Sequence, residues 1–270
     1  MGLLNVICIG FITFFAFKTN LYLGLALLLA MVIYGIYRYI PTYYAVRAQQ
    51  AFSDGDFQES KNWYKKSMDT KRAKLQIRLN YVYVLMRTGD FEEGERLLDE
   101  VIRVRYLKKE EYRKMAKQQR CMIYYKTGRI DEAIEEAEEM FEDGYKNTTM
   151  YAMLGFFKLL TNKNINEVTK FCEEAYDYND EDRDIRDNLS ICYYRQGNYE
   201  KAKEISDKII EDAPQFVEAH YHGAQIAEAM GDYKRANELL ENIKNCRRSA
   251  MTTISEDDIE GLKRKISRKI

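Results

Sequence analysis

Two apolar runs open the chain, and an amphipathic helical pattern follows them. Residues 2–17 and 21–37 contain no charged side chain, and a short polar break, Lys18-Thr19-Asn20, separates them. A helix needs about 20 residues to cross a bilayer, with about 17 as the lower limit. Both runs are short by this measure, but their ends carry tyrosines of the kind found at membrane interfaces: Tyr22, Tyr34, Tyr37 and Tyr39. The pattern predicts a transmembrane helical hairpin over residues 1–40, with apolar helices at 2–17 and 21–37.

Two other interpretations of this region stay open, a cleaved signal peptide and a single anchor with a re-entrant first segment. A signal peptide is disfavoured because no Lys or Arg precedes the first run and no small-x-small site follows it. The break holds Lys18, whereas Arg38 and Arg47 follow the second run, and this bias places the rest of the chain in the cytoplasm. Five cysteines without CxxC spacing agree with a reducing compartment. We therefore expect a two-pass membrane protein with a cytoplasmic domain.

After residue 40, a turn followed by a helix start recurs at nearly constant spacing. It is clearest at Gly197-Asn198-Tyr199 and Gly231-Asp232-Tyr233, and the equivalent turns begin at positions 55, 89, 128, 163, 197 and 231. The intervals are 34, 39, 35, 34 and 34 residues. A glycine at the turn can adopt positive φ and end one helix. The fourth copy departs from this, with Lys163 in place of glycine, and a charged insertion near residues 106–114 lengthens one interval. The fixed period predicts a stacked array of helix pairs.

This register resembles the tetratricopeptide repeat (TPR) family, whose helix-turn-helix units bind other proteins. The resemblance covers residues 41–247 and includes a mostly small residue five positions after each turn: Ser60, Gly94, Ala133, Val168, Ala202 and Ala236. It implies an all-α fold, a right-handed superhelical α-solenoid of about six TPR helix pairs. Pro41 is expected to open the first repeat helix, where its missing N–H costs little.

Residues 248–270 are expected to form a linker and a C-terminal capping helix. Ser255 is a helix N-cap residue, and the acids at 256–258 favour the positive end of the helix dipole. Ile259, Leu262 and Ile266 follow at helical spacing. A terminal helix of a solenoid must cover the last open face while its outer face stays wet, and this segment meets that requirement.

The TPR resemblance implies that the first helix of each unit lines a concave groove. Ten, six and three residues before the turns, the chain places an apolar, aromatic and methionine-rich set: Leu79, Tyr83, Met86, Met122, Tyr125, Met153, Phe157, Tyr194 and Tyr221. Exposed patches of this kind tend to bind partners, and methionine adapts to varied surfaces. The expected ligand is an extended or helical peptide with apolar anchors. Alternatively, a tightly wound superhelix or the hairpin's neighbours fill the groove, because apolar stripes are more often core.

Catalysis, metal binding and nucleic-acid binding find little support. The two histidines, His220 and His222, diverge by about 200° on a helix, and no HExxH, GxSxG or phosphate loop is present. His220 is expected to be a core or boundary residue. The formal net charge of −1 argues against a general nucleic-acid binder, and basic residues are not interleaved with aromatics. We expect no enzyme activity and no cofactor.

Charge is nevertheless segregated along the array. Residues 61–120 carry 17 Lys/Arg against 9 Asp/Glu, and residues 121–190 carry 8 against 17. The basic part could face anionic lipid headgroups, or it could be a solvated face.

The sequence therefore predicts a membrane-anchored protein–protein interaction scaffold that binds a partner segment in the concave TPR groove. Two alternatives remain: a structural spacer or self-associating module, and an envelope-assembly factor with the repeats outside the cytoplasm. The expected partners are a protein or peptide and, through the hairpin, the lipid bilayer, with self-association possible and no nucleic acid.

Overall fold

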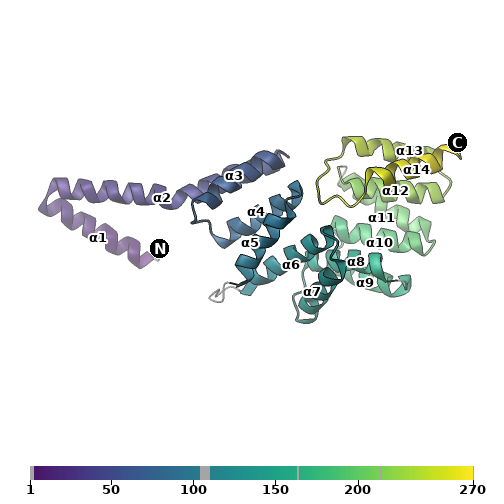
Figure 1. Cartoon of the computed structure of the whole chain (residues 1–270), viewed down its shortest axis with the longest axis horizontal. Helices are drawn as coiled ribbons and strands as arrows, with labels where there is room; N and C mark the ends of the chain where they lie inside the picture. The colour runs from purple at the N-terminus through teal and green to yellow at the C-terminus, as the bar shows by residue number, and fades with distance from the viewer. Residues whose placement is uncertain (1–2, 104–109, 163, 213–214, 270) are drawn as a thin grey trace. The chain divides into compact units, whose positions relative to one another are not determined.

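The computed structural model describes residues 3–103, 110–162, 164–212 and 215–269, and every regular element in these ranges is a helix (Figure 1). The helices are α1 (Leu3–Thr19), α2 (Leu21–Ser53), α3 (Phe57–Asp69), α4 (Leu75–Thr88), α5 (Phe91–Arg103), α6 (Glu110–Lys126), α7 (Ile130–Glu142), α8 (Thr148–Thr161), α9 (Ile165–Tyr178), α10 (Arg183–Arg195), α11 (Tyr199–Asp212), α12 (Val217–Ala229), α13 (Tyr233–Asn242), a 3₁₀ turn (Ile243–Asn245) and α14 (Glu256–Ser267). The predicted all-α fold is confirmed. Lys163 and part of the predicted insertion near 106–114 lie outside the described residues.

Five turn glycines end the first helix of their units as predicted. Gly55, Gly89, Gly128, Gly197 and Gly231 have φ values between 78° and 85°, a region that favours glycine. In each of these turns the next residue donates its N–H to the carbonyl four positions before the glycine, as in the 2.9 Å bond between the amide of residue 198 and the carbonyl of residue 193. This is the Schellman arrangement, which satisfies a carbonyl that the helix end leaves free.

Small residues let the paired helices approach closely. The predicted positions five residues after each turn are all buried: Ser60, Gly94, Ala133, Val168, Ala202 and Ala236. A Cβ on Gly94 would already lie 3.1 Å from the Ile123 side chain, which is tighter than ordinary van der Waals contact. These columns therefore form the core between helices, as the repeat register predicts.

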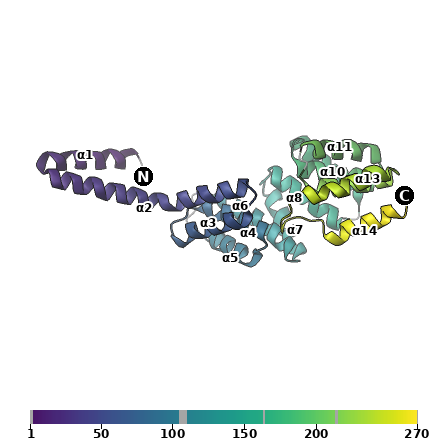
Figure 2. The same ribbon diagram turned by 90° about the horizontal axis from the view of Figure 1, so that it is seen from above.

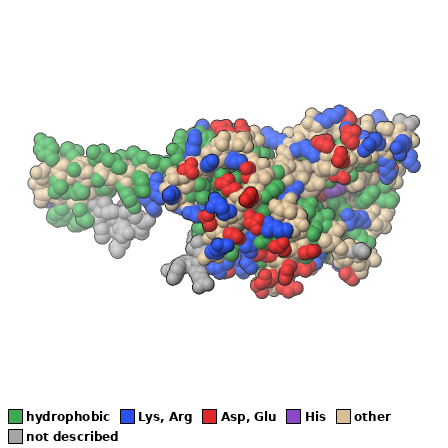
Figure 3. Space-filling view, viewed as in Figure 1, with side chains coloured by type: hydrophobic (Ala, Val, Ile, Leu, Met, Phe, Trp, Pro, Cys, Tyr) green, Lys and Arg blue, Asp and Glu red, His purple; other side chains and the backbone are tan. Residues whose placement is uncertain are grey.

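The chain divides into two compact units, residues 1–81 and 82–270. In the first unit α1 lies beside the start of α2 (Figures 1 and 2), and the Thr13 hydroxyl donates to the Met31 sulfur at 3.3 Å. Among the described side chains of these two helices, many of those visible in Figure 3 are hydrophobic. Among the described residues, α2 is the helix long and apolar enough to cross a membrane, with a mean hydropathy of 1.8 in its best window. α1 has 17 residues, and the two-pass arrangement stays a prediction.

Pro41 does not open a helix, and that prediction was wrong. It lies inside α2, which continues without a break from the apolar run into the first repeat. A proline inside a helix leaves the carbonyl four residues earlier, that of Tyr37, without its usual donor. Arg72, after α3, donates its Nη1 to this carbonyl and places its guanidinium 3.4 Å from the centre of the Tyr37 ring. The Ser67 hydroxyl also donates to the Pro41 carbonyl at 2.7 Å. The Arg72 bond replaces the missing helical bond, and the Ser67 bond ties α3 to α2 at the proline.

The predicted capping helix is α14. Its N-cap residue Ser255 accepts a 3.1 Å hydrogen bond from the Asp258 amide, while the Asp258 carboxylate accepts one from the Ser255 amide at 2.9 Å. This reciprocal pair is a capping box. Ile259, Leu262 and Ile266 are buried in one cluster with residues of α12 and α13. The last repeat is therefore covered as expected.

Candidate partner-binding groove

The predicted groove residues separate into two groups by burial. Four of the nine are buried, and their exposed fractions are 4% or less: Leu79, Met86, Met153 and Phe157. Met153 and Phe157 belong to a hydrophobic cluster that also contains Cys121 and Met140. These four side chains are core groups in the structure, so a partner that binds them would have to displace their neighbours.

The other five predicted residues are accessible to different degrees. Tyr83 is 39% exposed, and Met122, Tyr125, Tyr194 and Tyr221 are half-buried. Burial raises the pKa of Tyr125 and Tyr221, so both phenols stay neutral at physiological pH. The Tyr83 hydroxyl accepts a 2.6 Å hydrogen bond from Arg87 Nη2. That a partner contacts these residues stays a prediction.

A strap, defined here as residues Ser249–Ile254 between α13 and α14, lies against the first helices of several units. In Figures 1 and 2 this yellow segment extends toward the helices in the middle of the chain before it returns into α14. Its residues are half-buried, apart from Ile254, which is buried. A tight turn shapes it, in which the Thr252 amide donates to the Ser249 carbonyl at 3.0 Å.

Three groups from distant repeats bind the strap, one backbone carbonyl and two side chains. The Ala250 amide donates to the Arg87 carbonyl at the end of α4, at 3.1 Å. Lys126, at the end of α6, donates its Nζ to the Thr252 carbonyl at 2.9 Å. Glu218, at the start of α12, accepts from the Thr253 amide at 2.8 Å and from the Thr253 hydroxyl at 3.1 Å.

Sequence reasoning missed these polar groups. Arg87 and Lys126 both stand two residues before a turn glycine, a column that the search for apolar groove residues did not include. A basic residue in the same column of consecutive units was the available signal. Glu218 is half-buried and stands thirteen residues before Gly231, and nothing in its local sequence separates it from the other glutamates.

A buried ion pair joins α10 and α12 nearby. His222 Nδ1 lies 3.0 Å from both carboxylate oxygens of Asp187. Burial lowers the pKa of His222, but the charge and hydrogen bond of Asp187 outweigh burial and raise the pKa above its usual 6.5. His220 is buried, which agrees with the predicted core or boundary position. Within the described ranges, no group of three or more His, Cys, Asp and Glu side chains is placed to hold a metal ion.

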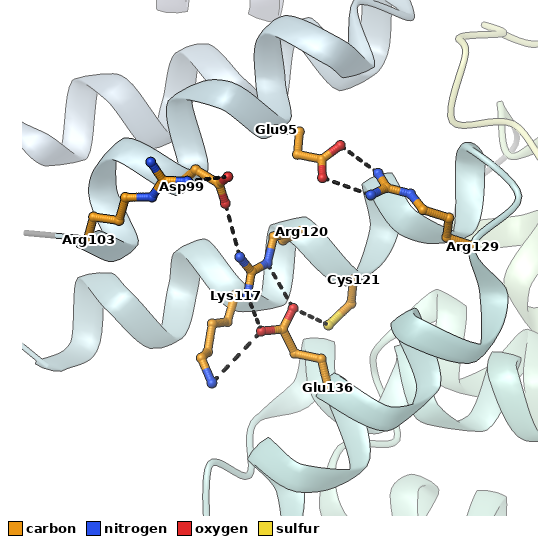
Figure 4. A network of polar contacts seen from close by, with 8 residues as sticks. All are labelled: Glu95, Asp99, Arg103, Lys117, Arg120, Cys121, Arg129 and Glu136. Carbon is orange, nitrogen blue, oxygen red and sulfur yellow. Dashed lines mark hydrogen bonds and ion pairs between the residues drawn. The ribbon is translucent and has the colours of Figure 1, made fainter.

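A second polar network lies between α5, α6 and α7 (Figure 4). Arg120 donates to both carboxylate oxygens of Glu136, at 3.0 and 2.5 Å, and to Asp99 at 3.0 Å. Arg129 makes a two-bond pair with Glu95 at 2.9 and 2.5 Å. Opposite charges satisfy one another throughout this network, so its role is to hold the three helices together.

Cys121 lies at the edge of the same network, 4.0 Å from a Glu136 oxygen (Figure 4). Burial, with a smaller contribution from the Glu136 charge, raises the pKa of this thiol to about 12. Because the thiolate is the reactive form of cysteine, Cys121 is chemically inert at neutral pH.

The comparisons with known proteins agree with this architecture. Residues 159–226 match the family model of the tetratricopeptide repeat. No curated protein sequence matches the chain significantly.

Among solved structures, the chain is similar to a tetratricopeptide repeat protein from Parabacteroides merdae, with 14% identity, 84% of this chain and 86% of that chain covered, and a TM-score of 0.54. It is similar to PilW, a type IV pilus biogenesis factor, with 17% identity, coverages of 72% and 85%, and a TM-score of 0.55. It is also similar to the Cut9–Hcn1 hetero-tetramer of APC/C, with 11% identity, coverages of 83% and 42%, and a TM-score of 0.65. The three TM-scores show a shared fold, and at these low identities they show the fold alone.

The repeat spacing, the positive-φ turn glycines and the buried small-residue columns follow one register, and the family match covers residues 159–226 of it. The resemblance found in the sequence is thereby confirmed: the chain carries tetratricopeptide repeats, within an all-helical solenoid of the TPR fold.

Proposed function

We propose that the protein is a membrane-anchored scaffold that captures a segment of a partner protein on the first helices of its TPR units. The observation that supports this most directly is the strap. The groups that hold it, Arg87, Lys126 and Glu218, bind its peptide backbone, so the face they form can bind non-helical polypeptide. Accessible aromatic side chains at Tyr83 and Tyr194 supply apolar contact area for a bound segment.

The anchor part of the proposal is supported by α2. Its exposed side chains include Leu29, Ile33 and Ile36, each more than half exposed, and such a surface is unusual in water. In this proposal the apolar N-terminal helices cross the bilayer twice and the repeats lie in the cytoplasm, as the charge bias around Lys18 and Arg38 indicates.

Photo-crosslinking of the full chain in native membranes tests the capture. A photo-reactive residue replaces Tyr83 or Tyr194, and a matched control replaces Tyr178, an exposed tyrosine on the second helix of its unit, α9. We expect one defined protein adduct from the first two positions and none from the control. Adducts of the chain only with itself would support the spacer or self-association alternative, and equal adducts from all three positions would contradict a specific groove.

A further inference from the structure

We propose that the strap is an internal competitor for the groove: it occupies the groups that bind a partner's backbone, and it must leave before a partner segment binds. This inference rests on the proposed function and adds its regulation and the chemistry of the ligand. The partner it implies is a non-helical peptide segment that offers a backbone carbonyl to Lys126 and a backbone N–H to Glu218.

The strap is bound as a ligand would be. Its three backbone bonds go to residues far away in the sequence, on α4, α6 and α12, each on the first helix of a different unit. The side chains of Ser249, Ala250, Thr252 and Thr253 are small, whereas Ile254, at the end of the strap, is buried in the cluster of α12, α13 and α14. Recognition therefore depends mainly on backbone groups, which every peptide carries, and another segment can make the same bonds.

Residues 249–253 of the strap can leave without unfolding their neighbours, while Ile254 stays in the buried cluster of α12, α13 and α14. Before it, α13 is held by the buried Leu239 and Leu240. After it, α14 is held by its own buried residues and by Lys265, whose Nζ lies 2.6 Å from Glu228. The linker between these two fixed elements keeps the strap near the groove, at an effective concentration on the order of millimolar, which disfavours weak partners.

The strap satisfies two charged groups that are partly removed from water. Lys126 and Glu218 are half-buried, and burial lowers the pKa of Lys126. Half-buried charged groups need partners, so release of the strap is favourable when another segment replaces its bonds. A partner segment that takes the place of the strap makes the same bonds to Lys126 and Glu218. Opening of the strap to water alone leaves these two groups with weaker partners.

A labelled peptide with the sequence of residues 247–255 is the probe, and its binding to the full chain in detergent micelles is the measurement. Thr253→Pro in the full chain removes the N–H that Glu218 accepts, and Arg247→Pro places the same residue at an exposed position of the same linker. If the strap is closed at least nine-tenths of the time, release raises the apparent affinity about tenfold or more. We expect this increase for Thr253→Pro and none for Arg247→Pro.

A disulfide lock supplies the opposite state. A Cβ at position 89 would lie 3.3 Å from the Ala250 Cβ, so Gly89→Cys with Ala250→Cys, in a Cys246→Ser background, can join the strap to the α4 turn. The oxidised protein should bind the peptide at least tenfold less tightly than the same protein after reduction, and any strain at position 89 is common to both forms. Equal binding by oxidised and reduced protein would overturn the proposal.

The lock also separates this inference from the proposed function. In native membranes, oxidation should abolish the partner adduct at Tyr83, and reduction should restore it. A partner adduct that persists in the oxidised form would refute the competitor role and leave partner capture intact. If no partner adduct forms in either redox state while the peptide responds to the lock, the strap occupies the groove but capture of a protein partner is refuted.

Discussion

The ion pair between Arg120 and Glu136 offers a direct test of what holds the third repeat together. The two side chains are 17% and 11% exposed, and two hydrogen bonds join them. Loss of one partner from a fully buried pair costs about 3–5 kcal/mol, and an exposed pair is worth about 0–1 kcal/mol. Arg120→Met leaves Glu136 with Lys117 at 3.8 Å as a weaker substitute. We therefore expect a cost between these limits, about 2 kcal/mol.

Hydrogen exchange of the full chain is the suitable assay, because repeats unfold locally and amide exchange reports each helix separately. A loss of about 2 kcal/mol makes the amides of α5–α7 exchange about 30-fold faster, since each 1.4 kcal/mol is a factor of ten. The matched control is Arg96→Met, on α5 itself. Arg96 and Glu100 lie 2.6 Å apart, but their side chains are 61% and 46% exposed, so its loss should cost less than about 0.5 kcal/mol.

A double-mutant cycle with Glu136→Gln completes the test. If the pair acts as a unit, the double variant should cost about 1–2 kcal/mol less than the sum of the single variants. Exchange in α5–α7 that changes less than about twofold in Arg120→Met, or strictly additive single costs, would show that burial does not strengthen this pair. The network in Figure 4 would then contribute little to the stability of these helices.

Two further predictions concern the C-terminal repeats. The pKa of His222 is raised in the folded chain, so its pairing with Asp187 stabilises the fold fully below pH 6.5 and less as pH rises through the folded-state pKa. Urea unfolding should show this loss of stability in the wild type and not in His222→Gln. The same pH dependence in His222→Gln would contradict the prediction. Gly197 has φ 78°, and no heavy atom lies within 4 Å of the place that a Cβ would take, so Gly197→Ala should cost about 1 kcal/mol of stability from backbone strain alone. Gly261 lies in the open middle of α14, and Gly261→Ala should raise the stability by about 0.5–1 kcal/mol. Thermal unfolding of both variants checks this, and equal effects would refute the strain argument.

The parts of the fold that the sequence predicts are those fixed by local chemistry. A glycine such as Gly197 ends a helix because of its own backbone freedom, and Ser255 starts one through an amide three residues away. Both signals act over a few residues, so they can be read without the structure. Pro41 shows the limit: its local preference favours a helix start, but Arg72 and Ser67 stabilise a continuous helix instead. That compensation comes from residues 26 or more positions away in the chain.

The predicted groove residues differ in burial for a related reason. A period of 3.6 residues identifies the apolar side of a helix. This apolar stripe is wider than about 100°, so it includes positions that face the next helix as well as positions that would face a groove. Phe157 and Tyr194 both belong to the inner stripe, yet Phe157 is fully buried and Tyr194 is half-buried. The depth of each position depends on how neighbouring units pack. The polar residues that bind the strap depend on a contact between positions 126 and 252, which no repeat period encodes.

The strap also changes how the repeat array should respond to a ligand. In a solenoid each unit contacts its neighbours, and stability is close to a sum of neighbouring terms. The bonds from the strap to Arg87, Lys126 and Glu218 connect the second, third and sixth repeats directly, and so add a term that skips the repeats between them. A partner that replaces the strap by touching the same three groups keeps this connection, whereas one that touches a single repeat removes it. If the proposed capture occurs, we expect the stability of the array itself to favour binding of the first kind, and the four residues 250–253 of the strap show that a short segment reaches all three groups.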